Sequence, residues 1–574
     1  MSDPAANSEL QYDAVILGGG FAGVYCARSL ARQLGPDAAK RVALISNENF
    51  MVFQPMLAEV VGSAISPRHV VNPLRLLCRD ITVLRANIRG IDLENCRLHL
   101  EAGDFTGPVS VGFQHLVLTL GGIVDLSRVP GMPEHALLMK NVGDALKLRG
   151  AILDRFEEAN TLVDAAERKR LLTFVIVGGG YSGVETAGQI LDLALEIVHF
   201  YSRISADEPQ VVLVHSGSHL LPEISESLGR YTEENLRNRG VELILNARVT
   251  AMTASRVKLN DGRTIDSHTV VSTVGNAPHP LIADLCKKGS ITSEKSRIIT
   301  DTSMRVPGHP RLWAAGDCAA VPMHSAKTSQ ASAGGKSPMM PSPFKPQSYC
   351  PPTAQFAVRQ GTLLGKNVAG ALQNGRCDRP FTFTGLGELA AIGHHSAVAE
   401  IMGCKFHGFI AWWLWRSIYL AKLPGLERKL RVMIDWTLDL FFPRDITLFQ
   451  ARPTELLKEM HLEPGDHVFH AGDPALSLYI VKTGRLELRD DDGKVLRTVT
   501  PGMQIGKQTL VTSKVWRFSA LAVESSALVM VSGKVFETVV NAGSSAEEAF
   551  AHPAPSLTPA SIPAAASEPA SLAR

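Results

Sequence analysis

The stretch AVILGGGFAG at residues 14–23 is an apolar run that ends in a glycine-rich turn, and it decides the fold. A similar stretch, FVIVGGGYSG, occurs at residues 174–183. Helical patterns follow both copies, from Val24 to Gln33 and from Val184 to Leu195. Each copy therefore predicts a buried strand, a tight turn and a helix, which is the context that a dinucleotide-binding turn needs. Together they indicate an α/β protein with two Rossmann-like units.

The three glycines of each turn have different expected roles. The first (Gly18, Gly178) permits the bend, and the second (Gly20, Gly180) lets a pyrophosphate approach the backbone. The third (Gly23, Gly183) lets the helix pack closely against the strand. The N-terminus of each helix then presents free N–H groups and a partial positive charge to the phosphates. A single copy is also common as an ordinary turn, but two complete copies predict two dinucleotide sites.

Each unit should offer an acidic side chain to a ribose after its second strand. In the first unit Ser46 and Glu48 are the candidates, and in the second His215 follows the strand. Without a carboxylate to repel a 2′-phosphate, the choice between NADH and NADPH stays open. The alternative that His215 is an ordinary turn residue also stays open. Gly275, which follows the strand patterns that end at Val274, is a further nucleotide-binding candidate.

Composition bounds the class of protein. The chain has 574 residues, with 58 basic and 56 acidic side chains and a net charge of +2. This length predicts several domains, and the near-neutral charge gives no reason to expect nucleic-acid binding. The eight cysteines form no close pair, which favours a reduced, cytosolic protein without a metal site. The polar segment 1–11 does not resemble a signal peptide, and no apolar run approaches the ~20 residues of a membrane span.

Three further motifs carry a resemblance to a known family. They are NFMVFQPML at 49–57, LWAAGDC at 312–318 and PPTAQFAVRQG at 351–361. With the two glycine turns, they resemble the type II NADH:quinone oxidoreductases, the single-subunit, non-pumping NADH dehydrogenases. This resemblance implies that FAD binds the first unit and NADH the second. Hydride would pass from the nicotinamide to FAD, and electrons would pass on to a membrane quinone of a respiratory chain.

The resemblance also assigns site residues. Asp317 matches the aspartate that bonds the ribityl chain of the flavin, and Gln355 the first glutamine of the quinone motif beside the flavin. Arg359 replaces the second glutamine of that motif. Glu185 matches a glutamate near the nicotinamide and the quinone, although a carboxylate there also suits a helix N-terminus. Gln189 stands where the family often has a second glutamate.

Other flavoenzymes remain as alternatives. Disulfide reductases need a close cysteine pair, which is absent from the sequence, and sulfide:quinone oxidoreductases need two cysteines at the flavin. Cys350 lies near the flavin motif without an evident partner. A soluble NAD(P)H diaphorase or ferredoxin-reductase type of enzyme, and a flavin-bound redox sensor, are the remaining alternatives.

The segment GFIAWWLWRSIYL at 408–420 is rich in residues that favour a membrane interface. A second helical pattern follows, with a polar stripe of Glu427, Arg431, Asp435 and Asp439 opposite apolar residues. Six basic residues and one acidic residue between 405 and 431 favour anionic lipids. We expect Phe409 to Phe442 to contact the cytoplasmic face of the inner membrane peripherally. Two core helices or a homodimer interface are the alternatives.

The region from Leu462 to Val540 resembles a cyclic-nucleotide-binding domain, most clearly in EPGDHVF at 463–469. Such domains bind the cyclic phosphate through an arginine, which Arg517 matches, and the ribose through a glutamate. Lys507 replaces that glutamate and cannot accept a hydrogen bond. We expect a barrel that binds cyclic nucleotides weakly, if at all, and a working sensor is the alternative.

The expected fold class is α/β, with two Rossmann-like domains, amphipathic membrane-binding helices and a small β-barrel of the jelly-roll kind. The FAD domain has two parts, 12–125 and 296–400, and the second part contains a flexible insertion at 323–350. The NAD(P)H domain occupies 168–295. The membrane helices occupy 401–449, the barrel 453–542 and a disordered tail 543–574.

Overall fold

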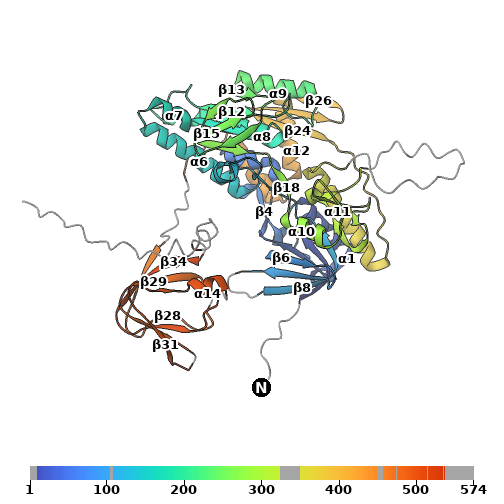
Figure 1. Cartoon of the computed structure of the whole chain (residues 1–574). Helices are drawn as coiled ribbons and strands as arrows, with labels where there is room; N and C mark the ends of the chain where they lie inside the picture. Colours follow the sequence, from blue (N-terminus) through green and yellow to red (C-terminus); the bar gives the residue numbers. More distant parts are fainter. Residues whose placement is uncertain are drawn as a thin grey trace, which may run out of the picture. The chain divides into compact units, whose positions relative to one another are not determined.

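The computed structural model describes residues 10–103, 108–323, 349–448, 457–473, 475–490, 492–512, 515–533 and 536 (Figure 1). Contacts divide the chain into two units, Met1–Gln450 and Ala451–Arg574, and each is described by itself. Most of the predicted insertion, residues 324–348, lies outside the described residues, and so does the whole predicted tail.

The first glycine turn belongs to a sheet that gathers strands from distant parts of the chain. Its order is β21 (Arg305–Val306), β22 (His309–Ala314), β8 (Pro108–Leu118), β1 (Leu10–Leu17), β2 (Val42–Ser46) and β5 (Thr82–Arg85). β6 (Asn87–Asp92) and β7 (Arg97–Glu101) extend it beside β8. The central strands from β22 to β5 are parallel, which explains why their sequences are apolar without alternation.

A helix from far along the chain completes this first layer. α11 (Ala354–Asn374) packs against α1 (Phe21–Leu34), the helix that follows the first turn. The approach is close because a Cβ on Gly361 would lie 2.2 Å from the carbonyl oxygen of Ala22. The helix predicted from the sequence motif at 351–361 therefore lies beside the turn at residues 18–23.

The second glycine turn belongs to a separate parallel sheet. Its order is β10 (Leu137–Leu138), β17 (Thr269–Ser272), β11 (Thr173–Val177), β12 (Gln210–Val214) and β13 (Val241–Ile244). The helices around it are α6 (Val142–Thr161), α8 (Tyr181–Ile197) and α9 (Glu226–Asn238), and β14 (Val249–Met252), β15 (Arg256–Leu259) and β16 (Thr264–Asp266) form a small sheet. The structure confirms the predicted α/β fold with two Rossmann-like units.

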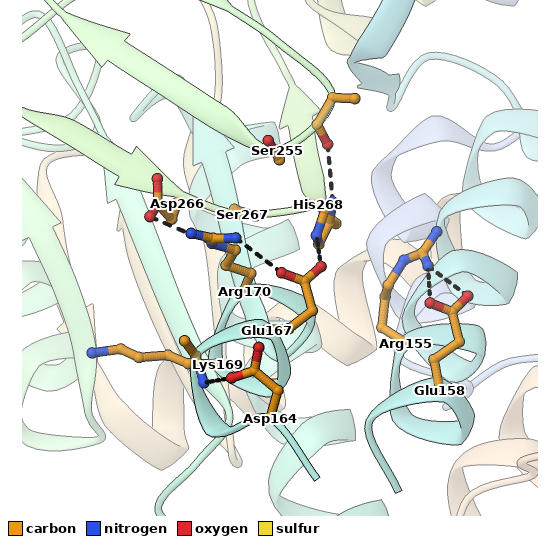
Figure 2. Close-up of polar contacts among 12 residues, drawn as sticks. Arg155, Glu158, Asp164, Glu167, Lys169, Arg170, Ser255, Asp266, Ser267 and His268 are labelled. Carbon is orange, nitrogen blue, oxygen red and sulfur yellow. Dashed lines mark hydrogen bonds and ion pairs between the residues drawn. The ribbon is translucent and has the colours of Figure 1, made fainter. Parts of the chain in front are cut away.

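An ion-pair network fixes the entry to this second sheet (Figure 2). Glu167 on α7 (Ala165–Leu171) contacts Nε2 of His268 at 2.6 Å and pairs with Arg170 at 3.0 Å. Arg170 in turn pairs with Asp266 of β16 at 3.5 Å. The network ties α7 to the neighbouring sheet just before β11, whose far end carries the second turn.

The segment after α11 forms a small antiparallel sheet and two helices. The strands are β24 (Gly387–Gly393), β25 (Ser396–Ile401) and β26 (Cys404–His407), and the helices are α12 (Gly408–Lys422) and α13 (Leu426–Leu438). Trp415 of α12 and Trp436 of α13 are buried in the same core cluster as α8. Among the described residues, no helix is both long enough and apolar enough to cross a bilayer.

The two helices turn an apolar face outward. Leu430, Met433, Ile434, Leu438 and Phe441 are between 47% and 76% exposed. Part of the predicted polar stripe points inward instead. The carboxyl of Asp435 contacts the ring of His69 and accepts the N–H of Ser66, and Asp439 pairs with Arg444 at 3.4 Å. One face of the two helices thus packs in the core, and the other is an exposed apolar surface.

The second unit consists of two antiparallel sheets. One contains β27 (Leu457–Leu462), β34 (Ser526–Ser532), β29 (Ser477–Thr483) and β32 (Gln504–Ile505). The other contains β28 (His467–Phe469), β33 (Ser519–Ala522), β30 (Leu486–Arg489) and β31 (Val495–Val499). The rings of Phe469 and Trp516 stack at 3.7 Å in the core. The arrangement agrees with the predicted jelly roll.

Candidate active site

The two glycine turns share the same geometry. The N–H of Gly18 donates to the carbonyl of Ile45 at 2.8 Å, and that of Gly178 to the carbonyl of Val214 at 2.9 Å. A Cβ on Gly23 would lie 1.9 Å from the Gly18 oxygen, and one on Gly183 would lie 1.8 Å from the Gly178 oxygen. The third glycine of each turn therefore permits the close packing that the sequence predicts for it.

The second glycine of each turn faces open space. A Cβ on Gly20 or Gly180 would meet no atom within 4 Å. Both residues are the N-caps of long helices, α1 and α8, and no side chain caps either helix. Free N–H groups and the helix dipole thus face these open positions, where an anion can be held.

A cavity of about 700 Å³ lies at the first turn. Its lining includes Gly18, Gly20, Ser46, Glu48 and Asp317, five of the residues that the sequence singled out. The volume lies within the range of cofactor sites. The donors at the helix N-terminus and the carboxylate at the end of β2 match the pyrophosphate and ribose of a dinucleotide. The residues present therefore fit FAD.

Asp317 reaches this cavity from the short helix η5 (Gly316–Cys318). Gln360 on α11 fixes the segment by accepting the Gly316 N–H at 2.9 Å. Burial raises the pKa of Asp317, and the charges of Lys140 and Arg297 oppose that shift. The sequence reasoning missed Lys140, which also lines the cavity, because no motif marks it.

His215 and Gly275 lie at the carboxyl ends of the second sheet. Nδ1 of His215 accepts the N–H of Gly179 at 3.1 Å, so the imidazole packs directly on the second turn. Gly275 has φ +96°, and a Cβ there would lie 2.6 Å from the oxygen of Asp125. Both residues are therefore within the region where a nucleotide on this sheet would bind, and His215 is not a free surface side chain.

Glu185 lies one turn inside α8. Its Oε1 accepts the N–H of Ala391 at 3.1 Å and the indole N–H of Trp415 at 3.3 Å. The residue as a whole is half-buried. Burial of its carboxyl raises the pKa to about 8. Nearby charge from Glu59 adds to the increase. The group can therefore hold a proton at neutral pH.

The two quinone-motif residues contact other protein groups. The amide of Gln355 donates to Glu388 at 3.2 Å and accepts the Leu386 N–H at 3.2 Å. Arg359 lies over the ring of Phe383 at 3.9 Å and bonds the Gln355 carbonyl at 3.0 Å. Ala354 and Ala357 of the same helix line the 700 Å³ cavity. The start of α11 thus faces the cavity, while Gln355 reaches toward β24.

Sequence reasoning missed several side chains of this region. Burial raises the pKa of the Tyr181 phenol, and the neighbouring carboxylate of Glu388 raises it further. Burial, with the charge of Glu185 next in importance, raises the pKa of Tyr419 as well. Tyr181 belongs to the second glycine-turn stretch and Tyr419 to the aromatic segment at 408–420, but neither stretch marks the side chain as functional, and Glu388 belongs to no motif. Only packing among α8, β24 and α12 brings them together.

Comparison with known proteins agrees with this geometry. Residues 12–335 match the family model of the pyridine nucleotide-disulphide oxidoreductases. Residues 386–445 match the NDH2 C-terminal domain, and 459–542 match the cyclic nucleotide-binding domain. The fold and site therefore define a pyridine-nucleotide-dependent flavoprotein with an appended cyclic-nucleotide-binding-like unit.

The similar proteins narrow this class. The type II NADH:quinone oxidoreductase Ndh of Mycobacterium tuberculosis is 30% identical over 446 residues, which cover 76% of this chain and 89% of that protein. An internal alternative NAD(P)H-ubiquinone oxidoreductase of Solanum tuberosum is 27% identical, with 77% and 89% coverage. The structure of NDH2 from Plasmodium falciparum in complex with NADH shares the fold, with a TM-score of 0.67, 20% identity and coverage of 76% and 99%. The chain belongs to the type II NADH:quinone oxidoreductases.

Proposed function

We propose that this chain oxidises NADH, or NADPH, at the second turn, passes hydride to FAD at the first, and delivers electrons to a membrane quinone without pumping protons. The observation that carries the proposal is the repeated turn. One copy faces a cavity that fits FAD, and the helix of the other carries Glu185, whose carboxyl has a raised pKa. Bound FAD supplies the two-electron chemistry that no side chain can provide.

The cofactor contacts follow from the two turns. Gly18, Gly20 and Gly23 shape the FAD turn, Ser46 and Glu48 bond the ribose, and Asp317 holds the flavin end. Gln355, the other candidate for the flavin end, bonds Glu388 and Leu386 instead and does not line the cavity. Gly178, Gly180 and Gly183 shape the NAD(P)H turn, with His215 and Gly275 at its ribose and nicotinamide sides. In each turn the backbone N–H groups of the helix N-terminus bind the pyrophosphate. The pyrophosphate can come close because the second glycine of the turn has no side chain.

At the reaction centre, Glu185 orients the nicotinamide or holds a proton for the quinone. Its contacts with Ala391 and Trp415 fix the carboxyl in place. Gln355 positions the segment before β24, and Arg359 stands beside Lys422 of α12, whose pKa its charge helps to lower. We therefore propose that the quinone enters beside Arg359, between α11 and α12.

The outward apolar face of α12 and α13 supports peripheral membrane binding through Phe409 to Phe442. Phe409, Trp413 and Phe441 are 64%, 59% and 76% exposed. Large apolar side chains gathered on one exposed surface mark a site that contacts a membrane or another protein. Basic residues between 405 and 431 favour the anionic cytoplasmic face of the inner membrane. A homodimer that buries the same face is the alternative, and its signature would be a concentration-dependent mass in detergent-free solution.

The domain limits proposed are 12–125 with 296–400 for FAD, 168–295 for NAD(P)H, 401–449 for the membrane helices and 453–542 for the appended unit. In that unit Arg517 is exposed. A Cβ on Gly506 would lie 2.7 Å from the indole of Trp516, so this ring covers the start of the nucleotide cassette. These features favour a role in contacts over cyclic-nucleotide sensing.

Anaerobic stopped-flow spectroscopy tests the proposed function. NADH should bleach the bound FAD in less time than one catalytic turnover takes, and a quinone should then reoxidise the flavin. Reoxidation by soluble acceptors but not by quinones would instead support the diaphorase or ferredoxin-reductase alternative. Slow turnover with every acceptor would support a redox sensor.

A further inference from the structure

A second cavity, of about 320 Å³, lies apart from the FAD site between α8, the β24–β25 turn, α12 and the segment after α13. Four carboxylates line it, and only two guanidinium groups do. They are Glu59, Asp192, Glu196, Asp439, Arg416 and Arg444. A polar cavity of this size holds several water molecules. The excess of carboxylates favours cations, including protons, over anions.

Glu59 is the most buried of these carboxylates, with 4% of the residue exposed on α3 (Leu57–Val61). Its Oε2 accepts the indole N–H of Trp436 at 3.1 Å. Burial raises its pKa to about 7, Asp439 adds to the increase, and Arg416, Trp436 and Arg444 oppose it. The group can thus gain and lose a proton near neutral pH, and no step of dinucleotide binding uses it.

Glu185 does not line this cavity but is hydrogen-bonded to a residue that does. Ala391 lines the cavity, and its N–H donates to Glu185. Trp415 bonds Glu185 and Trp436 bonds Glu59, with the two indole rings 6.5 Å apart. The two carboxyls interact electrostatically, because Glu59 raises the pKa of Glu185. Tyr419, whose pKa is raised by burial and then by the charge of Glu185, is another titratable group near Glu185.

The outer end opens at the turn between β24 and β25. His394 and His395 line the cavity and are both exposed, with left-handed φ of 44° and 54°. Such backbone strain persists where the surroundings hold it and often marks functional sites. The N–H of His394 donates to Asp192 at 2.8 Å, and the ring of His395 lies against Trp412 at 4.8 Å. The cavity therefore runs from an exposed histidine pair to the buried carboxyl of Glu59.

We propose that this cavity is the proton inlet for quinone reduction, with Glu59 as the relay between cavity water and Glu185. The proposal rests on the proposed function. NADH supplies a hydride, which is two electrons and one proton, while conversion of a quinone to a quinol needs two electrons and two protons. The balanced reaction, NADH + H⁺ + quinone → NAD⁺ + quinol, therefore takes one proton from solvent in each turnover.

The relay moves that proton in three transfers. Glu185 gives its proton to the quinone oxygen, and the resulting carboxylate takes the proton of Glu59. The Glu59 carboxylate then takes a proton from cavity water, which restores both groups. In this relay Glu59 acts only through Glu185 and does not line the FAD cavity, so it is a positioning residue for the proton rather than a catalytic one.

Glu59→Gln in the full-length holoenzyme tests the relay. The amide oxygen can still accept the Trp436 N–H, but the side chain cannot transfer a proton. We expect quinone to reoxidise the reduced flavin at least tenfold more slowly, with an unchanged KM for quinone. Reduction by NADH and reoxidation by ferricyanide, which takes an electron without a proton, should keep their wild-type rates. Added formic acid should restore part of the quinone rate in the variant.

The matched control is Glu208→Gln, since Glu208 is a half-buried carboxylate outside the cavity that pairs with Arg168. It should leave all three rates unchanged. Equal quinone rates for Glu59→Gln and wild type from pH 6 to pH 9 would overturn the proposal, and so would equal slowing with ferricyanide. If Glu59→Gln does not retain FAD, Ala64→Leu narrows the cavity with Glu59 intact and should slow only the quinone step. A wild-type enzyme that quinone does not reoxidise would refute the proposed function itself.

Discussion

Gly180→Asp separates the two dinucleotide sites most sharply. A Cβ at this position meets no atom within 4 Å, and Gly180 has φ −77°, so aspartate fits without strain. Its carboxylate would face the pyrophosphate of the bound nicotinamide nucleotide. One pair of like charges about 4 Å apart costs about 4 kcal/mol at an effective dielectric constant of 20. Screening by solvent lowers this value, so we expect at least 100-fold weaker NADH binding.

The assay is anaerobic stopped-flow reduction of bound FAD over a range of NADH concentrations. FAD content and melting temperature should equal those of the wild type, while the apparent Kd for NADH rises. Gly180→Ala adds the Cβ without the charge and should bind NADH nearly normally. Gly20→Asp, at the equivalent open position of the first turn, should instead lose FAD. Wild-type reduction of Gly180→Asp by NADH would show that the second turn does not bind the nucleotide.

Four further outcomes are expected. His215→Glu should lower kcat/KM for NADPH at least tenfold and leave NADH nearly unchanged, because a carboxylate repels the 2′-phosphate; equal losses would remove His215 from the ribose site. The pKa of Glu59 is raised to about 7 from 4.5, so the folded chain holds a proton that the unfolded chain has lost. Stability from this group is therefore full below about pH 4.5 and falls, by on the order of 3 kcal/mol, as pH rises through 7. Glu59→Gln should not lose this stability between pH 5 and pH 8.5, as followed by its melting temperature. If the melting temperatures of wild type and variant change equally between the two pH values, the reasoning is wrong. Serine at three exposed positions, Phe409, Trp413 and Phe441, should weaken binding to anionic vesicles at least tenfold in sedimentation, whereas Leu76→Ser, at a residue 72% exposed elsewhere, should not. Calorimetry of the full chain should find cyclic AMP and cyclic GMP bound no tighter than about 100 μM, near −5.5 kcal/mol, since Lys507 cannot accept the ribose hydroxyl; micromolar binding would restore the sensor alternative.

The sequence by itself determined the parts that local chemistry dictates. Glycine spacing after an apolar run has few structural solutions, so residues 14–23 and 174–183 predicted two turns that the structure shows with the same geometry. Short motifs made Asp317 and Gln355 candidates, and of the two only Asp317 lines the cavity at the first turn. The jelly-roll expectation for the second unit followed from its resemblance to cyclic-nucleotide-binding domains, carried by EPGDHVF at 463–469.

Only the tertiary structure decided what depends on packing between distant segments. The amphipathic pattern of α13 located a polar stripe, but it could not show that Asp435 and Asp439 face inward while the apolar side stays exposed. Glu59 belongs to no chemical motif, and its raised pKa exists only because α3, α12 and α13 bury it together. Burial and long-range charge are properties of the folded arrangement, which residue spacing along a chain does not encode locally.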